Sequence, residues 1–255
     1  MLIDPVEILK ELIAIPSVSP MRSEPDGVTT GESRLTAFLE KTLTQIGLKF
    51  SRQAVLPNRE NVIGVLEGDV PPAQGGRVVL LDAHQDTVPV DGMTIEPFCP
   101  KEQDGRIYGR GACDVKGGMA AILAAVSRLA HHRPAPLPTV MVAFTADEES
   151  GFRGAAGLTE PWAVADGSST LPRPDATIVL EPTALNIIVA HKGMIRWPAH
   201  VHGLAAHSAR PELGTNAIYG MARLVTAIEQ YAEQLAGGET DPYCGAATIS
   251  VAPFL

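Results

Sequence analysis

Three short apolar runs, each followed closely by acidic or imidazole side chains, constrain the fold of this chain most strongly. The runs predict strands at Arg77–Ala83, Thr139–Thr145 and Ala176–Leu180. Strands that are apolar along their whole length are typical of sheets covered by helices on both faces. In open α/β sheets, ligands bind beyond the carboxyl ends of the strands. The polar residues after these runs are therefore the first candidates for a functional site.

Amphipathic helices alternate with the strands. Asp4 and Pro5 begin the first predicted helix, as its cap and its first-turn residue. A second helix is predicted from Glu32 to Ile46, with Gly47 as its C-cap, and a third from Gly117 to Ala130. This alternation predicts an α/β fold in which helices sandwich a mostly parallel sheet.

The pattern changes after residue 193. Met194 to His202 alternates loosely, Thr215 to Leu235 predicts a long helix, and Ala246 to Val251 predicts a strand. A β-α-β unit with this different spacing indicates a second, smaller domain.

Composition excludes several classes of function. The 255-residue chain has a formal net charge of −9 and no basic stripe, which argues against a nucleic-acid surface. No apolar stretch reaches the roughly 18 residues of a membrane span, and the N-terminus lacks the features of a signal peptide. Three widely spaced cysteines indicate a reducing compartment, so we expect a cytoplasmic protein.

The first candidate site residues follow the strand at Arg77–Ala83. His84 and Asp86 are two positions apart, so their side chains lie on the same side of an extended segment. Asp86 can hold one nitrogen of the His84 ring and leave the other for a metal ion. The alternative interpretation is a strand end with a solvated turn.

A glycine-rich segment from Gly109 to Met119 leads into the third predicted helix. It lacks the spacing of a phosphate-binding loop. A tight turn that places Asp114 near a helix N-terminus is the better interpretation, either as a ligand or as a simple helix cap. We expect Cys113 to be a buried neighbour of this turn rather than a ligand.

Carboxylates also follow the other two strands. Asp147, Glu148 and Glu149 come after the second strand, and Glu181 comes after the third. Adjacent side chains in an extended segment point in opposite directions, so Glu148 and Glu149 can have different roles. An isolated acidic run is usually a solvated turn. Together with His84, however, these carboxylates form a ligand set that suits zinc, manganese or cobalt.

These motifs resemble those of the zinc-dependent M20-type peptidase and deacylase family, which includes acetylornithine deacetylase, succinyl-diaminopimelate desuccinylase, aminoacylase-1 and a glutamate carboxypeptidase. The resemblance extends from the first helix to the end of the chain. Five motifs carry it in order: His84 to Pro89, Gly109 to Gly118, Asp147 to Glu149, Glu181 to Thr183 and Gly203 to Arg210.

The resemblance implies a site with two zinc ions. His84 and Glu181 would bind the first ion, Asp114 would bridge both, and Glu149 would bind the second. Cobalt or manganese also suits such ligands.

The resemblance also implies three catalytic residues. Glu148 would be the general base that takes a proton from the bridging water, and Asp86 would orient His84. His207 would come from the lid of a dimer partner and stabilise the oxyanion of the tetrahedral intermediate.

Residues 1–193 would then form the catalytic di-zinc domain, and residues 194–255 the start of a smaller α+β lid and dimerisation domain. Family members carry one further zinc-ligating histidine near the end of a longer chain, and they complete the lid before returning to the catalytic sheet. Neither feature is matched in this sequence. The resemblance therefore implies a C-terminally truncated chain whose second zinc lacks its last ligand.

The implied reaction is hydrolysis of the amide bond of N-acyl amino acids, as in deacetylases and desuccinylases. The expected partners are a small N-acyl amino acid or dipeptide and a second copy of the chain, bound through the lid. A glutamate at position 181 favours the deacylase and carboxypeptidase members. Two alternatives are an aminopeptidase or dipeptidase of the same family, and an inactive remnant that binds metal or dimerises. A structural α/β domain without a site would require all four of these acidic segments to be coincidences.

Overall fold

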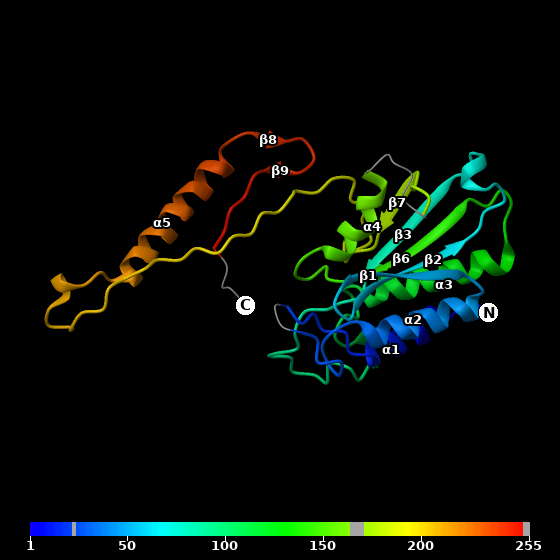
Figure 1. Cartoon of the computed structure of the whole chain (residues 1–255), viewed down its shortest axis with the longest axis horizontal. Coiled ribbons are helices and arrows are strands. Elements are labelled where there is room, and N and C mark those ends of the chain that lie inside the picture. The colour runs from blue at the N-terminus through cyan, green and yellow to red at the C-terminus, as the bar shows by residue number, and fades with distance from the viewer. Residues whose placement is uncertain (22–23, 164–170, 252–255) are drawn as a thin grey trace. The chain divides into compact units, whose positions relative to one another are not determined.

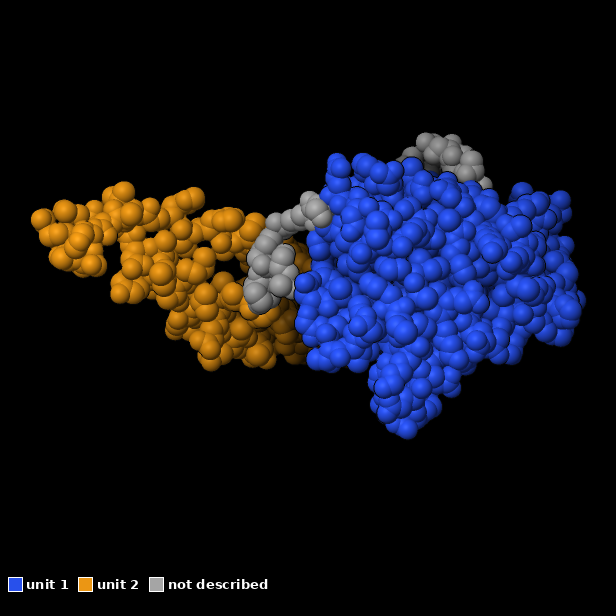
Figure 2. All heavy atoms as spheres, turned by 90° about the horizontal axis from the view of Figure 1, so that it is seen from below, with its two compact units in different colours: residues 1–182 blue, residues 183–255 orange. Residues whose placement is uncertain are grey.

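The computed structural model describes residues 1–21, 24–163 and 171–251 of the chain. Contacts divide the chain into two compact units, Met1–Pro182 (unit 1) and Thr183–Leu255 (unit 2), which Figure 2 shows in different colours. The division lies a short way before the domain boundary predicted after residue 193. The assignment of catalytic and lid roles to the two parts stays a prediction.

Unit 1 contains one five-stranded sheet and four α-helices among its described residues (Figure 1). Its elements in chain order are α1 (Pro5–Ala14), α2 (Ser33–Ile46), β1 (Lys49–Leu56), β2 (Arg59–Leu66), β3 (Val78–His84), β4 (Lys101–Gln103), β5 (Arg106–Tyr108), α3 (Lys116–His132), β6 (Thr139–Thr145), α4 (Arg153–Ala163) and β7 (Ala176–Val179).

The sheet has the strand order β1-β2-β6-β3-β7. β3 pairs in parallel with both β6 and β7, whereas β2 pairs antiparallel with both β1 and β6. The predicted α/β class is confirmed, but the sheet is mixed rather than mostly parallel, because two of its four strand pairings are antiparallel. Because β6, β3 and β7 run in the same direction, their carboxyl ends meet at one edge. Three of the four predicted ligands, His84, Glu149 and Glu181, lie at or just after the ends of these strands, and the fourth, Asp114, lies in the turn before α3.

Alternating side chains of β6 divide the core into two layers. Val142 and Phe144 pack into a cluster with α1, α2 and α3, whereas Met141 and Ala143 pack into a second cluster with Leu158 of α4. Successive strand residues point to opposite faces. All seven residues of β6 are buried, so helices cover both faces of the sheet here.

The predicted ends of the first two helices are confirmed. The Asp4 side chain accepts hydrogen bonds from the N–H groups of Val6 and Glu7, at 2.9 and 3.0 Å, and so satisfies donors that have no partner within α1. Gly47 ends α2 with a φ of 92°, a left-handed conformation that glycine adopts without steric strain.

The sequence pattern does not predict β1 or α4. None of the eight residues of β1 is buried, so its sequence lacks the apolar signal of the other strands. Its position comes from pairing with β2, in which Lys49 lies opposite Val65. α4 contains Gly154, Gly157 and Pro161, residue types that weaken a helical pattern.

Unit 2 contains α5 (Ala217–Ala236), β8 (Thr240–Asp241) and β9 (Gly245–Ala246). The predicted long helix is confirmed. The predicted strand at Ala246–Val251 is wrong beyond Ala246, and Met194–His202 does not form a strand. A strand exists only where its backbone groups pair in a ladder, and these residues have no ladder partner among the described residues.

The surface of unit 1 includes exposed apolar side chains at one edge of its sheet. β7 is an edge strand that pairs with β3 and, within the described ranges, with no strand on its other side. All four of its residues are exposed, including Ile178 and Val179.

Among the helices of the described residues, none has the length and apolar character required to span a membrane.

Candidate metal centre

His84 is the last residue of β3, and its side chain is buried. Its Nδ1 donates a hydrogen bond to the main-chain oxygen of Asp86 at 2.8 Å. A carbonyl oxygen only accepts, so Nδ1 carries a proton and Nε2 is the nitrogen available to a metal ion. Nε2 lies 3.1 Å from Oδ1 of Asp114 and 4.0 Å from Oε1 of Glu181. The ring is therefore oriented with its available nitrogen toward two carboxylates.

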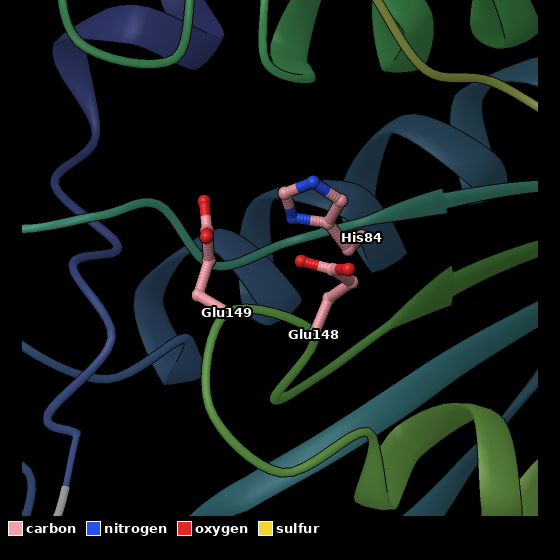
Figure 3. Close-up of side chains that lie close together, drawn as sticks. All are labelled: His84, Glu148 and Glu149. Atoms are coloured by element: carbon pink, nitrogen blue, oxygen red, sulfur yellow. The ribbon is translucent and has the colours of Figure 1, made fainter. Parts of the chain in front are cut away.

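Two groups of possible metal ligands share this imidazole. One group is His84, Glu148 and Glu149, and the other is His84, Asp114 and Glu181; within each group the ligand atoms all lie within 4.8 Å of one another. In the first group, the two glutamates come from the loop after β6 and the imidazole from the end of β3 (Figure 3). The structure thus brings together the four predicted metal ligands and the predicted base.

The turn before α3 places Asp114 at the site. Gly111 has a φ of 76°, and a Cβ added there would lie 2.8 Å from Cγ2 of Thr87, so this position requires glycine. The buried Lys116 donates from Nζ to two main-chain oxygens at the end of α1. Cys113 is exposed, which contradicts the prediction that it is buried, because the Asp114 turn lies at the protein surface.

Asp86 holds the turn that presents Glu148 and Glu149. Its Oδ1 accepts the N–H of Glu148 at 3.0 Å, and its Oδ2 accepts the N–H of Glu149 at 3.2 Å. The Asp86 carboxylate lies 3.7 Å from Nδ1 of His84, farther than the main-chain oxygen of the same residue. Asp86 therefore contacts His84 through its main-chain oxygen and the turn of Glu148 and Glu149 through its side chain.

A buried ion network lies behind the same turn. It consists of Glu32, Arg59, Asp86 and Asp147, and we call it the Arg59 network. No motif in the sequence predicts Arg59 or Glu32 as site residues. Arg59 lies 27 positions from Glu32 and 88 from Asp147, so no local spacing in the sequence connects these charges.

The electrostatics of the site indicate an excess of negative charge. Burial lowers the pKa of His84, but Asp86, Glu181 and Glu148 outweigh that effect and raise the pKa to about 10. Burial and neighbouring carboxylates raise the pKa of Glu149 to about 7, and they raise the pKa of Glu181 as well. Carboxylates that crowd together favour protonated forms unless a positive charge compensates them.

Comparison with known proteins identifies the family. Residues 80–254 match the peptidase family M20/M25/M40. The chain belongs to this family. It is 34% identical over 215 residues to acetylornithine deacetylase from Edwardsiella ictaluri (strain 93-146), a match that covers 84% of this chain and 52% of that protein. The chain thus spans about half the length of this curated relative.

Solved structures share the fold. Human carnosine dipeptidase 1 is 26% identical, with a TM-score of 0.52 over 62% of this chain and 34% of that chain. A tripeptidase from Staphylococcus aureus subsp. aureus Mu50 is 21% identical, with a TM-score of 0.57 over 89% of this chain and 57% of that chain. At this lower identity, the likeness supports the fold alone.

The side chains grouped around His84 fit a divalent metal ion. An imidazole nitrogen with a fixed tautomer and several carboxylate oxygens is the donor chemistry that zinc binds, and manganese and cobalt accept the same donors. The raised pKa values of His84 and Glu149 are consistent with a site that is completed by a cation. Ligand chemistry and electrostatics therefore agree with metal binding in this family.

His207 belongs to unit 2 and is exposed. Its Nδ1 accepts the N–H of Ala209 at 3.1 Å, which leaves Nε2 directed away from this local contact. Its role in catalysis stays a prediction.

Proposed function

We propose that this protein hydrolyses the amide bond of N-acyl amino acids with a metal-activated water. The observation that carries the proposal is the convergence of four carboxylates on one oriented imidazole, His84. The similarity to an acetylornithine deacetylase supports an N-acyl amino acid as the substrate class.

In this proposal the site holds two zinc ions. His84 and Glu181 would hold the first ion, Glu149 would hold the second, and Asp114 would serve both. The 3.1 Å separation of His84 Nε2 from Asp114 Oδ1 supports a shared position for these two ligands. When bound, zinc lowers the pKa of its water to about 7 and polarises the substrate carbonyl.

Glu148 is the proposed general base. Its carboxylate belongs to the same ligand group as His84 and Glu149, and this proximity supports its acceptance of a proton from water at the metal position. Glu148 then delivers that proton to the leaving amine, which completes the hydrolysis. Asp86 keeps both the base and the imidazole in place through its three hydrogen bonds.

We further propose that a homodimer forms through unit 2 and that His207 of one copy stabilises the oxyanion in the other. The exposure of His207 supports a role outside its own unit. Three free cysteines are in keeping with a reducing compartment, and so with a cytoplasmic protein.

A dipeptidase of the same family is the second candidate. The 26% identity to human carnosine dipeptidase 1 favours it. Both candidates use the same metal centre and differ in whether the substrate has a free amino group. An inactive remnant that binds metal or dimerises is the third possibility to test.

The experiment compares hydrolysis of N-acetyl amino acids with hydrolysis of dipeptides by the zinc-loaded chain. We expect the N-acetyl substrates to be cleaved, and Glu148→Gln to lower kcat by about 10²- to 10⁴-fold while zinc content is retained. Glu67→Gln, at an exposed carboxylate paired with Lys49, is the matched control. Cleavage of dipeptides alone would favour the second candidate, and zinc binding without turnover of either substrate would favour the remnant.

A further inference from the structure

The Arg59 network joins three carboxylates to one guanidinium in the interior of unit 1. Its side chains are almost fully buried: Glu32 and Asp86 are 0% exposed, Asp147 is 2% exposed and Arg59 is 3% exposed. Buried charges are retained in proteins only when they are paired and hydrogen-bonded. Each member of this network is therefore held by the others.

Arg59 uses all three of its nitrogens in this network. Nε lies 2.8 Å from Oε2 of Glu32, and Nη2 lies 2.5 Å from the other oxygen of the same carboxylate, which makes a bidentate pair. Nη1 donates to Oδ1 of Asp147 at 2.6 Å. Nη2 also reaches Oδ2 of Asp86 at 3.4 Å.

The network ends on the turn that carries the proposed base and ligand. Glu32 accepts the N–H of Asp147 at 3.2 Å, and Asp86 accepts the N–H groups of Glu148 and Glu149. Three consecutive backbone amides of the turn therefore donate to carboxylates that Arg59 holds. Arg59 is thus linked to the turn directly through the Asp147 side chain and indirectly through Glu32 and Asp86.

The turn also has an unfavourable backbone conformation at its first residue. Asp147 has a φ of 67°, which is uncommon for a residue with a side chain. Such a conformation persists where the surrounding contacts determine it. Arg59 and Glu32 contact the side chain and the main chain of Asp147, and Ser150 donates to its Oδ1 at 2.7 Å.

We infer that Arg59, anchored by Glu32, is a positioning residue that fixes the turn bearing Glu148 and Glu149 and thereby sets the affinity of the centre for zinc. This inference rests on the proposed function, because it takes these two glutamates as base and ligand. Outer partners that orient metal ligands typically change metal affinity by about 10- to 100-fold when they are altered.

A lysine cannot replace this arginine. Lysine presents one compact ammonium group, whereas the planar guanidinium reaches carboxylates on several sides at fixed angles. Arg59→Lys therefore keeps the buried charge and loses the geometry. This substitution separates positioning from simple charge balance.

The test compares Arg59→Lys and Glu32→Gln with the unmodified chain. Arg52→Lys is the matched control, because Arg52 of the neighbouring strand also bridges two carboxylates, Glu40 and Glu60, but is exposed and does not contact the turn. Zinc affinity is measured by competition with a chelating dye. Amide hydrogen exchange of the segment 145–151 is measured in the metal-free chain, and circular dichroism verifies that each variant is folded.

We expect exchange of this segment to become at least tenfold faster in Arg59→Lys and Glu32→Gln, and zinc affinity to fall about 10- to 100-fold. Arg52→Lys should change neither quantity by more than about twofold, as expected for exposed ion pairs. Unchanged exchange, or faster exchange with unchanged zinc affinity, would overturn the inference.

The two proposals fail differently. If the unmodified chain binds no zinc and His84→Ala changes nothing, the proposed function is wrong. The exchange rates of Arg59→Lys and Glu32→Gln then decide by themselves whether Arg59 holds the turn. If zinc binds and is lost in His84→Ala, the metal centre stands, and the affinities of the Arg59 and Glu32 variants decide the inference.

Discussion

Units 1 and 2 both contain many large apolar side chains, but many of these side chains are buried in unit 1, whereas the described ones of unit 2 are exposed or only partly covered. In unit 1, Leu12, Leu123 and Phe144 are 0% exposed and belong to one continuous cluster. In unit 2, none of the described residues 183–251 is buried, and Leu185 and Ile195 are 102% and 83% exposed.

This contrast shows that an apolar pattern specifies an element but not its packing. Met221, Leu224 and Ile228 recur along one face of α5 at helical spacing, as core residues do, yet they are only partly covered. Helical stability in proteins comes mainly from tertiary packing of such a face. We therefore expect substitutions in the two units to differ sharply in effect.

The largest difference should come from removing an aromatic side chain. Phe144→Ala should lower the free energy of unfolding of unit 1 by about 3–5 kcal/mol, because it removes a fully buried ring and leaves a cavity. Trp197→Ala, at a ring that is 59% exposed, should change it by less than about 0.5 kcal/mol. Urea unfolding followed by circular dichroism measures both. Equal effects would contradict the contrast between the units.

Zinc should stabilise unit 1 alone. At about 100 times its Kd, a ligand that binds only the folded state adds about 2.7 kcal/mol to the free energy of unfolding. The pKa of Glu149 is raised to about 7 and that of His84 to about 10, so zinc must displace protons from both groups at pH 6 but mainly from His84 at pH 8. The stabilisation should therefore be smaller at pH 6 than at pH 8.

Urea unfolding at a fixed zinc concentration measures this effect at each pH. His84→Ala is the control, and it should abolish the effect at both pH values. Stabilisation of equal size at pH 6 and pH 8 would show that protonated ligands do not compete with zinc.

Replacing one glycine of each unit by alanine should give a smaller difference in stability between the units. A Cβ at Gly154 would lie 2.2 Å from the main-chain oxygen of Ala146 and 2.7 Å from Oδ1 of Asn61, whereas a Cβ at Gly193 would have no atom within 4 Å. Gly154→Ala should lower stability by about 1–3 kcal/mol through overpacking. Gly193→Ala should be neutral, and destabilisation by Gly193→Ala in urea unfolding would indicate packing that the structure does not show.

Removing the helix caps should give the smallest difference in stability between the units. Asp4 and Asn216 each accept two main-chain N–H groups at the start of α1 and α5. Asp4→Ala should lower the free energy of unfolding of unit 1 by about 1 kcal/mol. Asn216→Ala should reduce helical content at the start of α5 and leave the unfolding midpoint of unit 1 unchanged. A shift of that midpoint in Asn216→Ala would show that the two units unfold together.

The sequence predicts the elements of unit 1 wherever local pattern and burial agree. β6 has its predicted bounds because all seven of its residues are buried, and α1 begins at its predicted cap. The grouping of His84 with Glu148, Glu149 and Glu181 could also be predicted, because the carboxyl ends of parallel strands meet at one edge, whereas Asp114 reaches the group from the turn before α3. The roles of these residues stay predictions.

Other features depend on contacts that no local pattern records. β1 exists because β2 provides a ladder for a polar segment, and the predicted strand after Ala246 fails because no described strand pairs with it. The Arg59 network joins Glu32, Arg59 and Asp147 across the fold. A lone arginine or glutamate in a sequence gives no signal of such a partnership.

The exposed edge of β7 has a practical consequence for work with this protein. Ile178 and Val179 are 56% and 57% exposed on a strand whose outer backbone groups pair with no described strand. An unprotected apolar edge is a template to which another chain can add a strand, and such pairing leads to aggregation. Strand addition at this short edge is therefore the route by which we expect concentrated samples to aggregate, even though the core beside it is well packed.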